Sequence, residues 1–81
     1  MKTLILFATS GCHLCSVAEN IVAKALDRCP KPIQFIEKDI ADSDELIESY
    51  GTRIPVLRVQ DCEAELSWPF TEAQVIRFLN A

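Results

Sequence analysis

The chain has 81 residues, of which 49% are hydrophobic and 25% are charged, and its formal net charge is −4. This composition excludes a disordered chain and leaves room for one small domain, which we expect to span residues 1–81. The eight basic residues are outnumbered by twelve acidic ones and are scattered along the chain. We therefore expect neither nucleic acid nor an anionic membrane as a partner.

The first residues indicate a strand rather than an export signal. Only residues 4–8 form an uninterrupted apolar run, whereas an export signal carries about 7 to 15 apolar residues. No stretch approaches the roughly 20 apolar residues of a membrane span. We therefore expect a cytoplasmic protein, whose thiols stay reduced unless they take part in redox chemistry.

The first half of the chain predicts a strand, a helix and a second strand. Residues 4–7 form an apolar run typical of a strand buried on both faces. A helix is expected from Cys12 to no further than Cys29, where prolines follow. Its apolar side chains recur every three or four positions, as Leu14, Val17, Ala18, Ile21, Val22, Ala25 and Leu26. The next strand, over 33–38, should run parallel to the first because a helical crossover joins them.

A short acidic helix should follow. Asp42 or Ser43 can cap its N-terminus. Gly51 stands after it, at the position where a left-handed capping residue is expected.

The rest of the chain predicts a hairpin and a terminal helix. The strand-like segments 56–60 and 64–68 lie at hairpin spacing, and the turn between them lacks glycine, so a non-glycine residue should take a positive φ. Thr71 and Gln74 form a capping box that opens the last helix. The predicted class is α/β, with the order βαβαββα and a four-stranded mixed sheet flanked by helices.

Cys12 and Cys15 lie immediately after the first strand and open the first helix. Cysteines three apart on one helical turn can close a small disulfide ring, and the helix N-terminus favours the thiolate of the first. This predicts Cys12 as the nucleophile and Cys15, on the apolar side, as the resolving thiol. His13 is expected to face solvent and to tune the Cys12 thiolate. A C-x-x-C motif near a βαβ pattern indicates thioredoxin-like redox chemistry.

A second motif, R-I-P-V-L at residues 53–57, follows the S-G-C-H-L-C of residues 10–15 by about forty residues. Together they resemble the thioredoxin superfamily, and the small size is similar to its glutaredoxin branch. The match is narrower to small bacterial glutaredoxin-like proteins with a C-H-L-C site and a W-P-F segment, here residues 68–70. The resemblance implies that Pro55 is a cis-proline beside the cysteines and positions substrate, and that the backbone of Ile54 pairs with substrate as an added strand.

The chain departs from typical glutaredoxins in the segments that bind glutathione. Thr9 replaces their lysine, R-I-P replaces their T-V-P at residues 53–55, and residues 65–68 replace a G-G-x-D turn. Arg53 is still suited to hold a glutathione carboxylate. We expect no bound cofactor, and the electron donor is left open between glutathione and a reductase, since thioredoxin's W-C-G-P-C is also missing.

These observations predict a monomeric thiol–disulfide oxidoreductase that contributes to cell redox homeostasis. Its substrate would be a disulfide-bearing protein or a small thiol compound. A redox-silent binding module with the same fold is the alternative.

A metal-handling protein is the less favoured alternative, because a structural zinc site needs four ligands and the remaining cysteines are poorly placed to converge. Cys29, at a helix end, is expected to be a small packing residue. Cys62, in the hairpin turn, is expected to be exposed and incidental.

Overall fold

The computed structural model describes residues 2–80, and the predicted order βαβαββα is confirmed. A short 3₁₀ turn, η1, adds to it between the second strand and the second helix. The elements are β1 (Lys2–Ala8), α1 (His13–Asp27), β2 (Ile33–Asp39), η1 (Ile40–Asp42), α2 (Asp44–Tyr50), β3 (Val56–Val59), β4 (Glu65–Ser67) and α3 (Glu72–Leu79).

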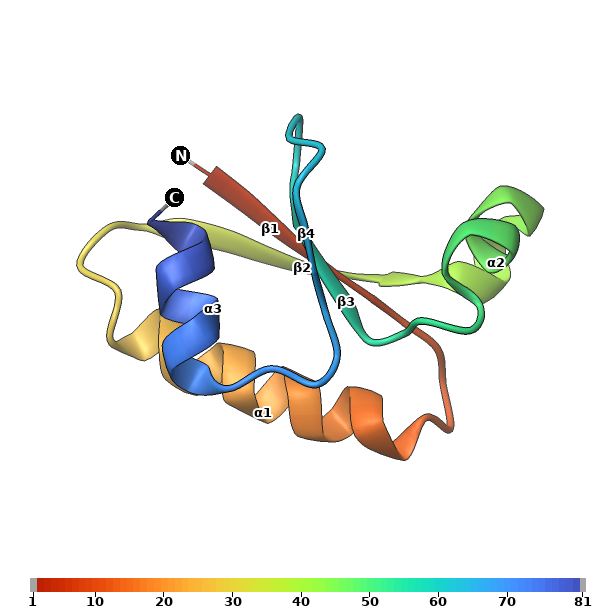
Figure 1. The fold of residues 1–81 in the computed structure, drawn as a ribbon, viewed down its shortest axis with the longest axis horizontal. Coiled ribbons are helices and arrows are strands. Elements are labelled where there is room, and N and C mark those ends of the chain that lie inside the picture. Colours follow the sequence, from red (N-terminus) through yellow and green to blue (C-terminus); the bar gives the residue numbers. More distant parts are fainter. Residues whose placement is uncertain (1, 81) are drawn as a thin grey trace.

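The four strands form one mixed sheet in the order β2-β1-β3-β4 (Figure 1). β1 pairs in parallel with β2 and antiparallel with β3, and β3 pairs antiparallel with β4. The parallel pair requires a crossover, which α1 supplies, whereas the hairpin needs only a short loop. The sheet thus agrees with the predicted fold class.

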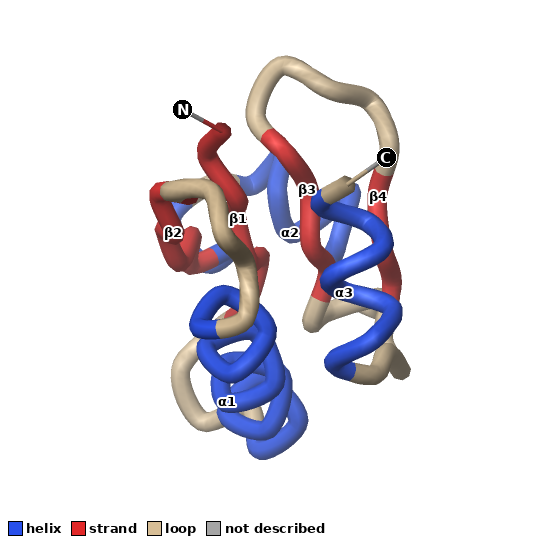
Figure 2. The backbone as a smooth tube through the Cα atoms, turned by 90° about the vertical axis from the view of Figure 1, so that its left-hand side faces the viewer, coloured by secondary structure: helices blue, strands red, loops and turns tan. Residues whose placement is uncertain are grey.

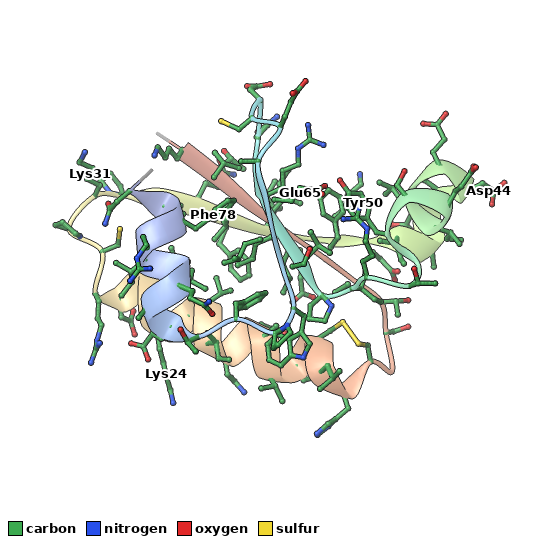
Figure 3. All side chains as sticks on the ribbon, in the orientation of Figure 1. Lys24, Lys31, Asp44, Tyr50, Glu65 and Phe78 are labelled. Carbon is green, nitrogen blue, oxygen red and sulfur yellow. A yellow bond between two sulfur atoms is a disulfide. The ribbon has the colours of Figure 1, made fainter. Side chains whose placement is uncertain are left out.

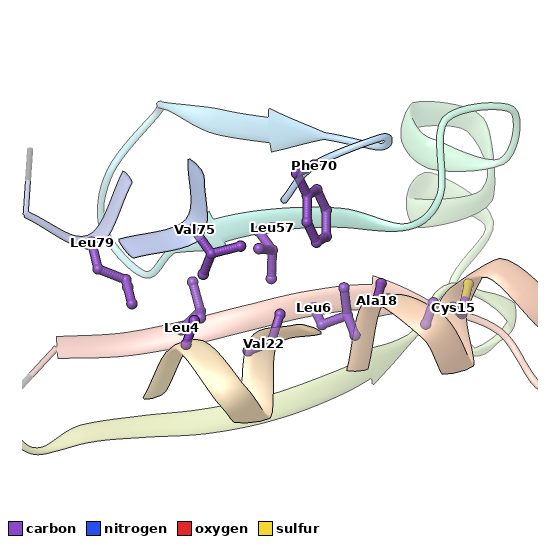
Figure 4. Packing of buried hydrophobic residues seen from close by; sticks show 11 residues of the cluster. Leu4, Leu6, Cys15, Ala18, Val22, Leu57, Phe70, Val75 and Leu79 are labelled. Atoms are coloured by element: carbon purple, nitrogen blue, oxygen red, sulfur yellow. The ribbon is translucent and has the colours of Figure 1, made fainter. Parts of the chain in front are cut away.

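Helices α1 and α3 pack on one face of the sheet and enclose the main core (Figures 2 and 4). Alternate residues of β1 point to this face, among them Leu4 and Leu6, and Leu57 joins them from β3. The helices contribute Cys15, Ala18, Val22, Ala25, Val75 and Leu79. Phe70 closes the cluster from the segment before α3 and is 3% exposed. This core includes Cys15, so the C-x-x-C motif is built into the packing of the domain.

The other face of the sheet carries a smaller cluster against η1 and α2. Phe7, Val56, Ile40 and Tyr50 are its buried members. The rings of Phe7 and Tyr50 stack with their centroids 4.2 Å apart. Residues of one strand alternate between the two faces, which explains why the sequence 4–7 is apolar throughout.

Hydrogen bonds from side chains set the starts of α2 and α3. Ser43, not Asp42, caps α2 and accepts a hydrogen bond from the backbone of Leu46. The capping box of Thr71 and Gln74 forms as predicted, with reciprocal distances of 2.8 and 3.2 Å. Polar side chains at these positions satisfy backbone N–H groups that have no partner within the helix.

The prediction for Gly51 is wrong. Its φ is −52°, because the chain continues in a right-handed turn after α2 and the Gly51 N–H still bonds to the carbonyl of Ile47. The position excludes a side chain for a different reason, since a Cβ there would lie 2.5 Å from that carbonyl oxygen. In the hairpin, Asp61 has the expected positive φ, at 69°.

The predicted apolar stripe of α1 is only partly buried. Leu14 and Val17 are 46% and 36% exposed, because the buried face of α1 runs through Cys15, Ala18, Val22 and Ala25 and leaves these two side chains beside it. The strands of the hairpin are also shorter than predicted, at Val56–Val59 and Glu65–Ser67.

Two further features concern the chain ends and membrane spans. Lys2 at the start of β1 donates a hydrogen bond of 2.7 Å to the carbonyl of Leu79, so both ends of the described chain meet. Within residues 2–80, no helix is long and apolar enough to cross a membrane.

Candidate active site

The candidate site begins where β1 ends. Between Ala8 and α1 the chain turns through Gly11, whose φ of +81° lies in the left-handed region that glycine adopts without steric cost. Cys12 then takes an extended conformation and becomes the N-cap of α1. The turn places Cys12 outside the helix and Cys15 within its first turn.

Cys12 and Cys15 form a disulfide, with their Cα atoms 5.2 Å apart (Figure 3). Cys12 is half-buried, whereas Cys15 is 5% exposed and belongs to the main core. The backbone N–H of Cys15 donates a hydrogen bond of 3.2 Å to Sγ of Cys12. The same N–H group would stabilise a negative charge on that sulfur when the pair is reduced. His13 lies between the two cysteines in sequence and is exposed.

The loop before β3 reaches the same end of the sheet. Phe7 pairs with Val56, so the residue after Phe7 and the residue before Val56 lie at one edge of the pairing. The residue before Val56 is Pro55, which is buried, and the Ile54–Pro55 peptide bond is cis. Ile54 packs against both apolar clusters. The sheet therefore brings two of the predicted site motifs to one end of the molecule.

Arg53 is held by atoms of its own chain. Its Nη1 donates to Oε1 of Glu65 at 3.1 Å, and its Nε and Nη2 donate to the carbonyl of Ser49 at 3.1 and 3.0 Å. The guanidinium carbon also lies 5.0 Å from the centre of the Tyr50 ring. The residue predicted to hold a substrate carboxylate thus already pairs with a carboxylate from β4.

Tyr50 completes this cluster. Its hydroxyl donates a hydrogen bond of 2.7 Å to Oε2 of Glu65, and both residues lie beside β3 in Figure 3. Burial raises the pKa of Tyr50, and the hydrogen bond to Glu65 raises it further. That hydrogen bond lowers the pKa of Glu65 and outweighs the opposing effect of burial, while Arg53 lowers it further. Glu65 is therefore an ionised carboxylate across the neutral pH range.

Sequence reasoning missed Tyr50 and Glu65 as parts of the site. Tyr50 ends α2 and its ring packs in the smaller apolar cluster, but no local pattern in the sequence indicates a partner for its hydroxyl. The available signal was an acidic residue in β4 at hairpin distance from Arg53 and Arg58. The register pairs Glu65 with Arg58, so opposite charges do face each other across the hairpin.

The other predicted residues occupy the expected surroundings. Cys29 is half-buried against the main core, and Cys62 is exposed in the hairpin loop, as predicted. Trp68 packs on the core and meets Phe70 edge to face, with ring centroids 5.0 Å apart. The Trp68–Pro69 peptide bond is also cis, which the sequence alone does not predict. Among residues 2–80, no three His, Cys, Asp or Glu side chains come together as metal ligands.

A mixed four-stranded sheet, a C-x-x-C pair opening the first helix and a proline before β3 define a thioredoxin-like protein. Comparison with protein families identifies one family within this class. Residues 3–80 match the glutaredoxin-like domain family (DUF836), and the chain belongs to this family. The predicted membership of the thioredoxin superfamily is confirmed. No match was found among curated protein sequences.

Solved structures agree with this assignment. The X-ray structure of protein XcR50 from X. campestris is similar to this chain at 35% sequence identity, with a TM-score of 0.78 and 95% of each chain covered. Protein Ne2328 from Nitrosomonas europaea has 24% identity and a TM-score of 0.72, over 96% of this chain and 89% of its own. Thioredoxin-2 of the malaria parasite, at 13% identity, shares the fold, with a TM-score of 0.77 over 99% and 82% of the two chains. The family, the neighbours and the cysteine pair together support a redox-type protein with a thioredoxin fold.

Proposed function

We propose that the protein is a thiol–disulfide oxidoreductase that works through Cys12 and Cys15. The observation that carries the proposal is the asymmetry of the pair. Cys12 is partly accessible, and its sulfur accepts the Cys15 N–H at a helix N-terminus, whereas Cys15 is buried one turn further on. An accessible thiol favoured as thiolate is suited to attack, and a buried neighbour is suited to resolve.

The reaction proceeds in two exchanges. The thiolate of Cys12 attacks a substrate disulfide, a bond forms between Cys12 and one substrate sulfur, and the other substrate sulfur leaves as a thiolate that takes up a proton. Cys15 then loses its proton and attacks Sγ of Cys12, which releases the second substrate thiol and closes the Cys12–Cys15 disulfide. Two electrons pass from the dithiol to the substrate. A thiol reductant returns them by the reverse exchanges.

The surroundings of the pair support the proposed roles of the other site residues. Pro55 and the backbone of Ile54 would position the substrate chain, because β3 brings their loop to the end of the sheet where β1 leads to Cys12. His13 would face the substrate from the first turn of α1. The exposed apolar side chains of Leu14 and Val17 on the same turns favour a protein substrate over a highly charged one.

The proposed setting follows from the sequence. The protein would act as a cytoplasmic monomer without a bound cofactor, nucleic acid or membrane partner, in the maintenance of cell redox balance. Its electron donor would be glutathione or a reductase.

The first test is a pH titration of alkylation in the reduced protein, with the modified cysteine identified by mass spectrometry. We expect Cys12 to react first and to ionise well below the value of about 8.5 that is typical of a free thiol. Equilibration in graded glutathione buffers should then show a reversible Cys12–Cys15 disulfide.

Three variants complete the test. Cys12→Ser should abolish reduction of a protein disulfide, and Cys15→Ser should accumulate the mixed disulfide. Cys62→Ser, which changes an exposed thiol outside the site, should have no effect. If Cys12 ionises near pH 8.5 and no internal disulfide forms, the oxidoreductase is refuted and the binding module becomes the better description.

A further inference from the structure

The guanidinium of Arg53 already makes several hydrogen bonds within the chain. A guanidinium binds a carboxylate through a fork of two parallel N–H groups. In this protein each of its three nitrogens already donates, Nη1 to Glu65, and Nε and Nη2 to the carbonyl of Ser49. The side chain of Arg53 is nevertheless 43% exposed, and it immediately precedes the Ile54–Pro55 segment. Arg53 is thus a positive group at the edge of the site with three of its five N–H donors already in use.

Glu65 is the carboxylate with which a ligand carboxylate would compete at Arg53. A carboxylate of an incoming thiol and the carboxylate of Glu65 are the same chemical group, so they compete directly for the guanidinium. Glu65 has the advantage of being fixed, because β4 holds its backbone opposite Arg58 and the Tyr50 hydroxyl holds its second oxygen at 2.7 Å. Its charge also repels any further carboxylate that approaches.

We propose that Glu65 is a specificity-determining residue, which keeps carboxylate-bearing small thiols away from the Cys12–Cys15 site by occupying Arg53. The inference rests on the proposed function, because it names the substrate class of that site. Thiols and disulfides without a carboxylate near the sulfur, including those of a protein chain, do not depend on Arg53 and remain acceptable. Tyr50 is a positioning residue in this scheme, since it acts only through Glu65.

The experiment measures how fast three thiols reduce the Cys12–Cys15 disulfide. In each case two thiol molecules are oxidised to one disulfide while the protein disulfide becomes two thiols. The probes are glutathione, which carries two carboxylates, neutral 2-mercaptoethanol and cationic cysteamine, all at neutral pH and low ionic strength. The readout is the ratio of the glutathione rate constant to the 2-mercaptoethanol rate constant, which cancels changes in the reactivity of the disulfide itself.

Glu65→Gln is the decisive variant, because it removes the charge and keeps the size and an acceptor oxygen for Tyr50. We expect it to raise the ratio of the glutathione to the 2-mercaptoethanol rate constant about three- to fivefold, the size of effect that a partly exposed ion pair has. The ratio of the cysteamine to the 2-mercaptoethanol rate constant should fall. Adding Arg53→Gln should cancel the gain. A ratio that does not change in Glu65→Gln, or a gain that survives Arg53→Gln, would overturn the proposal.

Glu72→Gln is the matched control. Glu72 also pairs with an arginine, Arg28, at 3.1 Å, so the variant makes the same change in charge and breaks a comparable pair. Arg28 follows the C-terminus of α1, a helix of 15 residues and about 22 Å, so this pair is remote from the disulfide. An equal gain in Glu72→Gln would assign the effect to net charge and reject a role for Glu65.

A second readout separates this proposal from the proposed function. S-methylglutathione cannot exchange disulfides, and its binding can be followed by NMR in the chain with Cys12→Ser and Cys15→Ser, with and without Glu65→Gln. Tighter binding of S-methylglutathione in the Glu65→Gln background supports the role of Glu65, whatever the redox result. Failure of every thiol to reduce the wild-type disulfide would refute only the proposed oxidoreductase. Unchanged binding would refute the role of Glu65 whatever the redox result.

Discussion

Tyr50→Phe removes one hydroxyl from the interior and leaves the aromatic packing in place. Tyr50 is 5% exposed, and its ring keeps the stack on Phe7 in the variant. The lost interaction is the hydrogen bond of 2.7 Å to the ionised carboxylate of Glu65. Hydrogen bonds to charged groups contribute about 1.5–3 kcal/mol, and the 25% exposure of the Glu65 side chain lowers this to about 1–2 kcal/mol.

That loss is measurable in a domain of this size. At 81 residues, the expected free energy of unfolding is about 4–12 kcal/mol. With a urea dependence of about 1 kcal/mol per molar, the unfolding midpoint should fall by about 1–2 M. Urea titration followed by circular dichroism at neutral pH gives the value directly, since small domains of this kind usually unfold in two states.

The pH dependence identifies Glu65 as the partner. Its pKa in the folded protein lies below the reference value of 4.5. A lowered folded-state pKa gives stabilisation that is complete above about pH 4.5 and is lost as the pH falls through the lowered value. The difference between wild type and Tyr50→Phe should therefore be full at pH 7 and should shrink toward pH 3.

A double-mutant cycle supplies the control. In the Glu65→Gln background the Tyr50 hydroxyl no longer bonds to a charged group, so Tyr50→Phe should lower the free energy of unfolding by no more than about 1 kcal/mol. If Tyr50→Phe costs the same in both backgrounds and at both pH values, its hydroxyl does not act through Glu65 and the reasoning fails.

Three other substitutions test the local geometry. Gly51→Ala should destabilise the protein by more than about 2 kcal/mol, because its Cβ would meet the Ile47 carbonyl, and equal urea midpoints would contradict this. Gly11→Ala should cost only about 1–2 kcal/mol, since its φ is positive but a Cβ would meet nothing within 4 Å; a loss above that of Gly51→Ala would be inconsistent with the structure. Burial, and then Glu19, raise the pKa of Glu37. A raised carboxyl pKa destabilises the fold increasingly as the pH rises above the ordinary value of 4.5, so Glu37→Gln should raise the urea midpoint at pH 7 and not below about pH 4.5.

Much of the fold could be predicted because local signals agree with tertiary packing. The capping box from Thr71 to Gln74 and the prolines after Cys29 fix helix ends through interactions within a few residues. Gly51 shows where this reasoning ends. A glycine after a helix is consistent with a left-handed cap and also with a position too crowded for a side chain, and only the conformation of the following turn distinguishes them.

The candidate site likewise combines features that the sequence predicts with features that it does not. The Cys12–Cys15 disulfide could be predicted from the spacing of the two residues, because a pair on one helical turn is a local feature. Arg53 could be recognised as a carboxylate-binding group, but its actual partner comes from a strand twelve residues away. Whether Glu65 faces Arg53 depends on the hairpin register, and a shift of one residue would turn it to the other face. Charge pairing between separate elements is therefore what the sequence leaves undetermined.

The contact between Lys2 and Leu79 makes the domain suitable for fusion to other groups and for circular permutation. The start of β1 and the end of α3 meet at the end of the molecule opposite the disulfide (Figures 1 and 3). A label, a surface anchor or a fused protein joined at either side of this contact would leave Cys12 accessible. A circular permutant could bridge residues 2 and 79 with a short linker and open the chain instead at the exposed hairpin loop near Cys62. Such a variant would keep every strand pairing, including that of β3 with β4, and would lose only the covalent loop between these two strands. It would therefore test whether the reactivity of the cysteine pair depends on the order of the elements in the chain.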